Sequence, residues 1–380
     1  MTRLHTVLLP VVLVACGGPA PSNGTGGGDA TGGGDATGGG DATGGGDATG
    51  GGDATDAGAT DAGLAISATA DTWSWVDFPE SKCASGTPTG LGVNPHPGAT
   101  QLLIFMQGGG SCASGESCWG ADPGAANLDG YDSVKFLANP QLNYPIFSRT
   151  SGGNPFADWS YVFVPYCTGD LHSGTVLRPL AFDGGTVDTY FWGATDLALF
   201  LPRLTATFPG VTRVVVTGGS AGGFGTMLSF DRVADAFGTR VDLLDDSGPP
   251  IVAKNGTQNG LLAYWGYQTP SNCTAPCNSF AKVLDAARAR QPGSRYGLMT
   301  FQSDPTISAD YGYTYPEYAT VLDDLVSGWP ADGGMRAFIV TNEERHVVMS
   351  ELALAPQYLP WVTQMVNDDP GWANITFQHP

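Results

Sequence analysis

Short apolar runs alternate with longer segments of helical periodicity over residues 64–380. The apolar runs predict buried strands, at 101–106, 161–164, 214–216, 241–244, 296–301 and 337–340. Each run is continuously hydrophobic, which is typical of strands covered on both faces of a sheet. Between them, apolar residues recur at helical spacing, near 188–207, 221–237, 279–290, 315–327 and 351–367. This alternation predicts an α/β fold with a mostly parallel central sheet and helices on both faces.

The first residues of the chain predict an export signal rather than part of the fold. Arg3, an apolar run over 7–14 and a small residue at Ala15 indicate a signal peptide over 1–15. The apolar run is too short to span a membrane. Cys16 directly after the expected cleavage point resembles a bacterial lipoprotein signal, so we expect lipidation of Cys16. The alternative is an ordinary secretory signal, which would leave the protein secreted rather than anchored to the cell envelope, at the outer membrane or cell surface.

Residues 16–63 have the composition of a disordered linker. Five copies of Gly-Gly-Gly-Asp-Ala-Thr fill 26–55. Calcium-binding β-roll repeats need an apolar residue in each repeat to build a core, and the largest side chain in these repeats is threonine. The segment therefore predicts a flexible tether, and about 45 such residues reach roughly 35–40 Å. Residues 64–380 then form one large α/β domain.

The charge of the chain argues against some partners. The net charge is −20, and without the seven linker aspartates the domain keeps 29 acidic and 15 basic residues, about −14. We therefore expect no nucleic-acid partner. The same charge weakens the case for a polyanionic substrate such as pectin itself.

Apart from Cys16, the chain contains six cysteines. An even number in an exported protein predicts three disulfides, for which the sequence permits fifteen pairings. Short separations favour Cys112–Cys118 and Cys273–Cys277, which leaves Cys83–Cys167. No matching histidine cluster accompanies the cysteines, so we expect no zinc or other metal.

The strongest chemical signal is Gly-Gly-Ser-Ala-Gly at 218–222, between a β-branched run and a helical run. A Gly-x-Ser-x-Gly turn in this context predicts a sharp elbow that exposes a nucleophilic serine, Ser220. The helix that follows offers free N–H groups to a developing oxyanion, first of all the N–H of Ala221.

A serine nucleophile needs a base, and few histidines are available. His5 lies in the signal, His96 in a proline-rich loop, and His379 is the penultimate residue. Of the remaining two, His172 and His346, the second follows the last predicted strand. The nucleophile–acid–base order of α/β-hydrolases therefore favours His346 as the base.

The acid that orients this base is expected between Ser220 and His346, after a strand. Asp304 follows the predicted strand at 296–301 and is the expected acid; the alternative is that it only forms a turn before Pro305. Asp246, beside Asp245 at the end of the preceding strand, is the alternative acid.

A second oxyanion donor is expected in the loop after the strand at 101–106. This loop reads Gln-Gly-Gly-Gly-Ser at 107–111, and the N–H groups of Gly109 and Gly110 are the expected donors. The stretch lacks the Lys-Ser/Thr ending of a phosphate-binding loop, so a nucleotide site is not predicted.

Together these motifs resemble the pectin acetylesterase family, which includes the Notum-type carboxylesterases. In order, they are Gly-Gly-Gly-Ser-Cys at 108–112, Val-Pro-Tyr-Cys-Thr-Gly-Asp-Leu-His-Ser-Gly at 164–174, Thr-Gly-Gly-Ser-Ala-Gly-Gly at 217–223, Asp-Ser-Gly at 246–248 and the late His346. The resemblance covers roughly residues 70–380. It implies an α/β-hydrolase fold, a Ser-His-Asp triad, no cofactor, and removal of acyl groups from oxygen esters.

Four further residues are candidates for the substrate pocket. Asp170 and His172 belong to the 164–174 motif, where they form either a pocket wall or a hydrogen bond that fixes a loop. Ser111 stands where the family usually has an aromatic residue, and Trp119 follows in the same segment.

The sequence thus predicts a surface-tethered or secreted serine carboxylesterase that works through an acyl-enzyme. The expected substrate is an acetylated polysaccharide. A longer acyl chain on protein or lipid is the alternative, and a non-catalytic surface lipoprotein that binds glycan or lipid is a rival of another class. The resemblance disfavours a protease. Membrane contact is expected through the lipid anchor only, and the sequence does not predict an oligomeric state.

Overall fold

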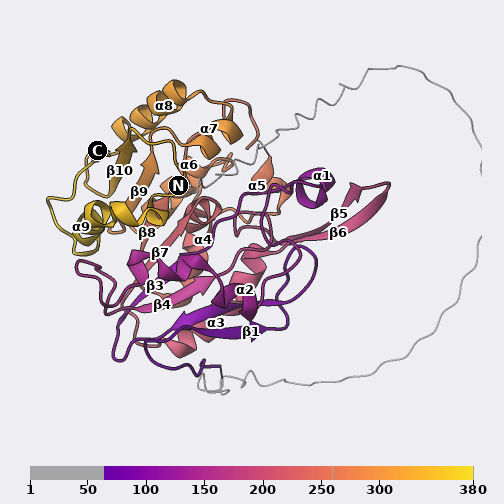
Figure 1. Ribbon diagram of the computed structural model, residues 1–380, viewed down its shortest axis with the longest axis horizontal. Coiled ribbons are helices and arrows are strands. Elements are labelled where there is room, and N and C mark those ends of the chain that lie inside the picture. The colour runs from indigo at the N-terminus through magenta and orange to yellow at the C-terminus, as the bar shows by residue number, and fades with distance from the viewer. Residues whose placement is uncertain (1–63, 259, 380) are drawn as a thin grey trace, which may run out of the picture. The chain divides into compact units, whose positions relative to one another are not determined.

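The computed structural model describes residues 64–258 and 260–379, so the expected signal peptide, Cys16 and the linker lie outside the described residues. Its strands are β1 (Ser74–Phe78), β2 (Thr89–Asn94), β3 (Gln101–Met106), β4 (Ser160–Val164), β5 (Val176–Phe182), β6 (Gly185–Phe191), β7 (Arg213–Gly219), β8 (Arg240–Asp246), β9 (Tyr296–Phe301), β10 (Met335–Thr341) and β11 (Ile375–Gln378). Nine of them form one sheet in the order β1-β2-β4-β3-β7-β8-β9-β10-β11 (Figure 1). β2 runs against both neighbours, and the remaining pairs are parallel.

Helices follow most of the parallel strands. They are α1 (Gly115–Trp119), α2 (Ser133–Leu137), α3 (Gly193–Thr207), α4 (Ala221–Phe237), α5 (Leu261–Tyr264), α6 (Phe280–Arg290), α7 (Pro305–Tyr311), α8 (Tyr315–Ser327) and α9 (Ala355–Val366), with short 3-10 turns η2 (Pro140–Asn143), η3 (Pro145–Phe147), η4 (Val348–Ser350) and η5 (Leu352–Leu354). Among the described residues, none of these helices combines the length and apolar character needed to cross a membrane.

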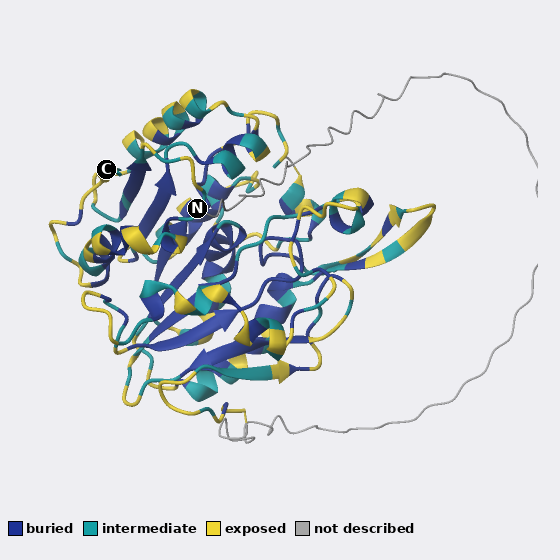
Figure 2. Cartoon of the chain, viewed as in Figure 1, coloured by how far each residue is buried: buried dark blue, intermediate teal, exposed yellow. Residues whose placement is uncertain are grey.

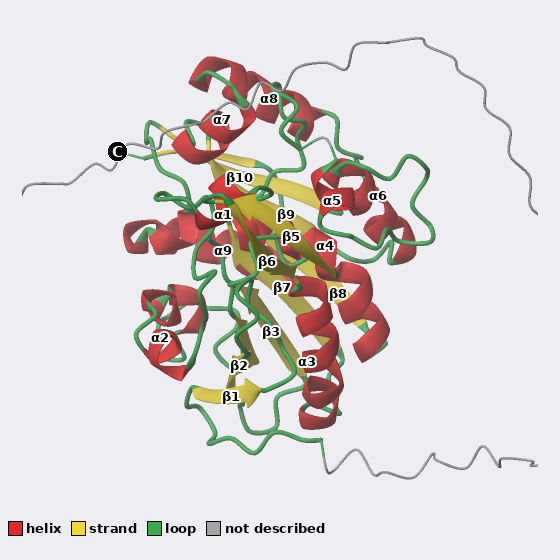
Figure 3. Ribbon diagram, turned by 90° about the vertical axis from the view of Figure 1, so that its right-hand side faces the viewer, coloured by secondary structure: helices red, strands yellow, loops and turns green. Residues whose placement is uncertain are grey.

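The sheet separates two hydrophobic clusters because successive side chains of a strand point to opposite faces. In β3, Leu102, Ile104 and Met106 join the cluster that α3, α4 and α6 cover, whereas Leu103 and Phe105 join the cluster that α2 and α9 cover. Figure 3 shows these helices on the two sides of the sheet, and Figure 2 shows the central strands buried throughout. This double burial accounts for the continuous apolar runs in the sequence.

The predicted α/β-hydrolase architecture is confirmed: a mostly parallel sheet carries helices on both faces. All six predicted strands are present, as are the helices expected at 221–237, 279–290 and 315–327. The helix expected from 188 begins instead at Gly193, because 188–191 belong to β6. β6 pairs with β5 in a two-stranded hairpin that extends away from the sheet in Figure 1. The last predicted helix begins only at Ala355, after two 3-10 turns.

All three expected disulfides are present. Cys83–Cys167 joins residues 84 positions apart, whereas Cys112–Cys118 and Cys273–Cys277 close loops of six and four. A disulfide restricts the unfolded chain more strongly when the loop that it closes is longer. Cys83–Cys167 is therefore the bond that stabilises the domain most.

Removing Cys83–Cys167 by double substitution to alanine should lower the free energy of unfolding by about 4–5 kcal/mol on the chain-entropy scale. The matched removal of Cys273–Cys277 should cost about 2 kcal/mol on the same scale. Urea unfolding of both variants, followed by tryptophan fluorescence, measures the difference. Equal losses in the two variants would contradict the loop-length argument.

Candidate active site

Ser220 occupies a strained turn between β7 and α4. Its backbone has φ 58° and ψ −122°, a conformation that non-glycine residues rarely adopt. The turn is held from the neighbouring strand, where the N–H of Ser220 donates to the carbonyl of Asp246 at 2.8 Å. Such strain persists only where surrounding contacts enforce it, and it concentrates at functional sites.

Glycines let the chain pass closely around this turn. A Cβ added to Gly222 would lie 1.9 Å from the carbonyl oxygen of Met106, and one added to Gly218 would lie 2.4 Å from the same atom. A Cβ on Gly108 would lie 2.2 Å from the carbonyl oxygen of Gly219. The end of β3 and the glycine loop that follows it are therefore in direct backbone contact with the serine turn.

His346 and Asp304, which are 42 residues apart, meet at the same edge of the sheet. Nδ1 of His346 donates to Oδ2 of Asp304 at 2.7 Å. The other carboxylate oxygen, Oδ1, accepts the N–H groups of Thr306 and Ile307 and so caps α7. One oxygen thus fixes the carboxylate while the other orients the imidazole.

The second imidazole nitrogen of His346, Nε2, is buried and has no hydrogen-bond partner among the described residues. A buried nitrogen without a partner is costly in a purely structural histidine. In a general base it suits the task, because catalytic hydrogen bonds often tighten only when substrate is bound.

The alternative acid, Asp246, has a different set of partners. Its carboxylate accepts the N–H groups of Val348 and Met349 at 2.9 and 2.6 Å, just after His346 in the chain. The Ser247 hydroxyl lies within hydrogen-bond distance of both the same carboxylate and the carbonyl of His346, and its one proton is shared between them. Burial raises the pKa of Asp246 to about 7, against the lowering effect of these hydrogen bonds. Asp246 therefore anchors the loop of His346 rather than its ring.

The glycine loop after β3 adopts conformations that require glycine. Gly109 and Gly110 have φ of 154° and 73°. The carbonyl of Gly109 accepts the N–H of Ala126 at 2.8 Å. On the other side of the serine turn, Ala221 is the first residue of α4, so its N–H is one of the free donors at the helix start.

Asp170 and His172 are almost fully buried, 0% and 2% exposed, so neither side chain offers surface to a substrate here. Asp170 accepts the hydroxyl of Thr168 and the N–H groups of Gly174 and Gly193. Burial is the largest influence on the pKa of Asp170, which is raised, and on that of His172, which is lowered to about 4. Both residues fix loops.

The other two pocket candidates lie near the β5–β6 hairpin and the glycine loop. The indole N–H of Trp119 donates to the Thr189 hydroxyl of β6 at 2.8 Å. Ser111 continues the glycine loop and is half-buried. Among the described residues, no three His, Cys, Asp or Glu side chains are grouped to hold a metal ion.

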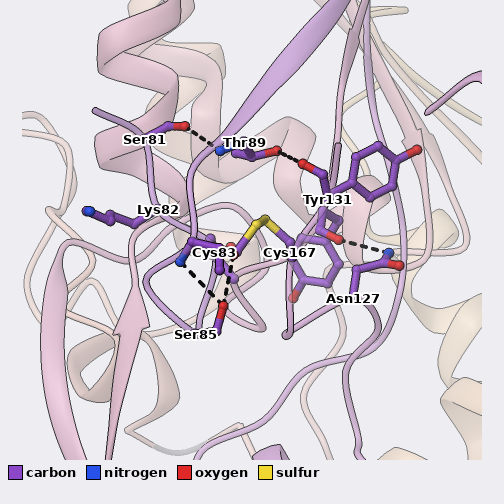
Figure 4. The surroundings of a disulfide bond; sticks show 12 residues. Ser81, Lys82, Cys83, Ser85, Thr89, Asn127, Tyr131 and Cys167 are labelled. Carbon is purple, nitrogen blue, oxygen red and sulfur yellow. Dashed lines mark hydrogen bonds between the residues drawn. A yellow bond between two sulfur atoms is a disulfide. The ribbon is translucent and has the colours of Figure 1, made fainter. Parts of the chain in front are cut away.

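The 164–174 segment is tied to the N-terminal part of the domain by Cys83–Cys167. Figure 4 shows this bond, with Thr89 linking Ser81 to the backbone of Tyr131 nearby. Asn127 donates to the carbonyl of Tyr166 in the same neighbourhood. Sequence reasoning singled out this segment as specific but did not single out Tyr166, whose hydroxyl contacts the glycine loop.

A family model described as pectinacetylesterase matches residues 75–267, about half of the chain. The chain belongs to the pectinacetylesterase family. The matched range includes Ser220, the glycine loop and the 164–174 segment, whereas Asp304 and His346 lie beyond it. Membership supports hydrolysis of carboxylic ester bonds as the class of reaction.

Curated relatives include the palmitoleoyl-protein carboxylesterases notum2 of Xenopus laevis, 32% identical over 163 residues, and NOTUM of Mus musculus, 28% identical over 176 residues. These matches cover 40% and 46% of this chain, and the chain spans about a third of each relative's length (30% and 32%). A crystal structure of the Wnt deacylase Notum from Drosophila has the same fold, with a TM-score of 0.60 at 17% identity, over 82% of this chain and 97% of that one.

Replacing Asp246 with asparagine should loosen the loop that carries His346. Asparagine offers one acceptor oxygen where the carboxylate offers two, so one of the Val348 and Met349 N–H groups loses its partner. The loss of about 1–3 kcal/mol should speed exchange of these amides by about 5- to 150-fold. Mass spectrometry of peptides covering 343–352 measures the exchange rate of these amides. Asp304→Asn is the control and should leave both amides protected, and unchanged exchange in the Asp246 variant would refute the anchoring role.

Proposed function

We propose that the domain is a serine carboxylesterase with Ser220 as nucleophile, His346 as general base and Asp304 as the acid that orients it. The observation that carries this proposal is the hydrogen bond between Nδ1 of His346 and Asp304. The other ring nitrogen, Nε2, is buried and has no partner within the part of the chain that the structure describes. The strained backbone of Ser220 at the end of β7 supports the same assignment.

The reaction follows from these groups. Ser220 Oγ attacks the ester carbonyl while Nε2 of His346 takes the hydroxyl proton, and Asp304 stabilises the imidazolium that forms. The N–H groups of Ala221, Gly109 and Gly110 bind the oxyanion. His346 then returns the proton to the departing alcohol, which leaves an acyl group on Ser220. Water, deprotonated by His346, attacks this ester and releases the carboxylic acid.

The assignment of Asp304 over Asp246 rests on which atoms are already engaged. Both carboxylate oxygens of Asp246 are occupied by the N–H groups of Val348 and Met349. Asp304 keeps one oxygen for the ring of His346. Loss of the acid in a serine triad leaves the imidazole in the wrong tautomer and lowers kcat by about 10⁴-fold.

We propose acetyl groups on a polysaccharide as the substrate, which the family description supports. A hollow of about 600 Å³ lies between the 143–153 loop and α9, and neither Ser220 nor His346 lines it. It therefore gives no evidence of room for a long acyl chain beside the nucleophile. The names of the Notum relatives favour a second candidate, a longer acyl group on protein.

Hydrolysis of p-nitrophenyl esters from acetate to palmitate should depend on Ser220 and be fastest with acetate. Ser220→Ala should lose at least about 10³-fold in kcat while the protein stays folded, because the acyl-enzyme cannot form. Asp304→Asn should lose about 10⁴-fold on the same substrates. Circular dichroism of each variant controls for folding.

The ester series also separates the alternatives. A maximum at longer chains would replace the acetyl proposal with a lipid or acylated-protein substrate. Full activity in Ser220→Ala would refute the nucleophile. A folded wild-type protein that hydrolyses none of the esters would instead favour a glycan- or lipid-binding module.

We further propose that the protein is exported and held at the cell envelope by a lipid on Cys16. The three disulfides fit an oxidising compartment. At the start of the described domain, Arg203 donates to the carbonyl of Leu64, and the N–H of Ile66 donates to the Thr207 hydroxyl at the end of α3. This end of α3 leads into the start of β7, whereas Ser220 follows its end. The described residues therefore begin near the amino-terminal ends of the strands, whereas Ser220 lies at a carboxyl-terminal end.

Cys16→Ser should release the protein from the membrane fraction while leaving its ester hydrolysis unchanged, because a thioether-linked lipid cannot form on serine. Expression of the full chain with its own leader in a bacterial host, followed by detergent partition and labelling with radioactive palmitate, tests this. Release of unlabelled protein supports the anchor. An unlabelled, soluble wild-type protein would show that Cys16 is not lipidated.

A further inference from the structure

The hydroxyl of Tyr166 bridges the 164–174 segment and the glycine loop. It donates to the carbonyl of Gly110 at 2.8 Å and accepts the N–H of Leu171 at 2.9 Å. Its ring lies against Gly109, where an added Cβ would be 3.0 Å from Cδ1. Tyr166 is fully buried, and burial raises the pKa of its hydroxyl well above the usual value. The hydroxyl therefore remains a hydrogen-bond donor.

His172 holds the first residue of the same loop, Gln107. Nε2 of His172 donates to the carbonyl of Gln107 at 2.8 Å, and its ring lies 4.7 Å from that of Tyr166 between centroids. The other side of the imidazole lies against α4. A Cβ added to Gly225 would be only 2.9 Å from Cδ2 of His172. With its pKa lowered to about 4, His172 stays neutral.

Two hydrogen bonds restrain the peptide planes on either side of Gly110. A peptide unit is planar, so fixing one carbonyl also fixes the N–H of the following residue. The Gly109 carbonyl accepts the N–H of Ala126, which fixes the plane of the Gly110 N–H, and the Gly110 carbonyl accepts the Tyr166 hydroxyl, which fixes the plane of the Ser111 N–H. With the planes on both sides held, the φ and ψ of Gly110 are held as well. Glycine alone would leave these planes free to rotate.

We propose that Tyr166 is a positioning residue of the oxyanion hole, acting through the backbone of Gly110, with His172 holding the same loop at Gln107. This inference rests on the proposed esterase function. An oxyanion hole accelerates the reaction only when its donors are already aimed at the developing charge. Tyr166 contributes to that aim indirectly, because its bond to the Gly110 carbonyl keeps the torsion angles of Gly110 in place.

Tyr166→Phe removes a single oxygen atom and tests the proposal. We expect kcat for p-nitrophenyl acetate to fall by about 10- to 100-fold, less than the loss on deleting an oxyanion donor. KM should stay within about twofold, because the oxyanion exists only in the transition state.

Tyr161→Phe is the matched control. Tyr161 is also fully buried, and its hydroxyl donates to the carbonyl of Phe156 at the same distance, 2.8 Å, near the opposite end of β4. Tyr166→Phe should lose more stability in urea unfolding, because it leaves two buried backbone groups without their partner and Tyr161→Phe leaves one. Tyr161→Phe should nevertheless keep kcat within about twofold. Equal losses of kcat in both would overturn the proposal.

The kcat/KM of an oxoester, compared with that of its thionoester, reports specifically on the oxyanion hole. Sulfur accepts hydrogen bonds weakly, so a thionoester gains less from the donors. Tyr166→Phe should therefore lower the oxoester-to-thionoester ratio of kcat/KM by about fivefold or more. An unchanged ratio would overturn the positioning role even if kcat fell.

The outcomes distinguish this inference from the proposed function. If the wild-type activity does not require Ser220, the esterase proposal itself is wrong. If it does, and Tyr166→Phe keeps its kcat and its ratio, only the positioning role is refuted. If Tyr166→Phe does not fold, His172→Phe and His172→Gln decide, because glutamine can restore a donor to Gln107. A higher kcat in His172→Gln than in His172→Phe supports the proposal. Equal kcat in the two variants overturns it.

Discussion

The site depends on one backbone constraint, the left-handed turn at Ser220. A serine in this conformation costs about 1–3 kcal/mol, which neighbouring contacts must offset. Three segments supply them: β8 accepts the Ser220 N–H, the end of β3 packs on Gly218 and Gly222, and the glycine loop packs on Gly219. The same contacts bring the glycine loop beside the nucleophile. Strain at the serine and the proximity of the loop are therefore two consequences of one arrangement.

The end of β8 connects the serine turn to the loop of His346. The carbonyl of Asp246 holds the N–H of Ser220, and its carboxylate holds Val348 and Met349. A single residue thus ties together two segments more than a hundred positions apart. Because the carboxylate of Asp246 is used in this way, the ring of His346 must be oriented from another strand, and Asp304 after β9 has a free oxygen for it.

The fold was largely predictable from the sequence because its central strands are buried on both faces. Continuous apolar runs located β3, β4, β7, β8, β9 and β10, and the elements between them had to be crossovers. The β5–β6 hairpin was missed because its strands are not buried on both faces. It lies outside the sheet, and along β5 exposed residues such as Leu177 and Pro179 alternate with more buried ones. It therefore contains no continuous apolar run, and the end of β6, 188–191, was instead included in the helix that follows.

For the candidate site, the sequence could select residue types but could not assign contacts between distant segments. Ser220 was marked by its local turn, and His346 by the scarcity of histidines. Asp246 ends β8 and Asp304 follows the end of β9, so their positions after parallel strands could not tell them apart. Their partners separate them. The carboxylate of Asp246 accepts two N–H groups of a loop about a hundred residues away, whereas that of Asp304 accepts the ring of His346. The same holds for Tyr166: its motif marked the segment, but only the fold brings its hydroxyl to Gly110, 56 positions earlier in the chain.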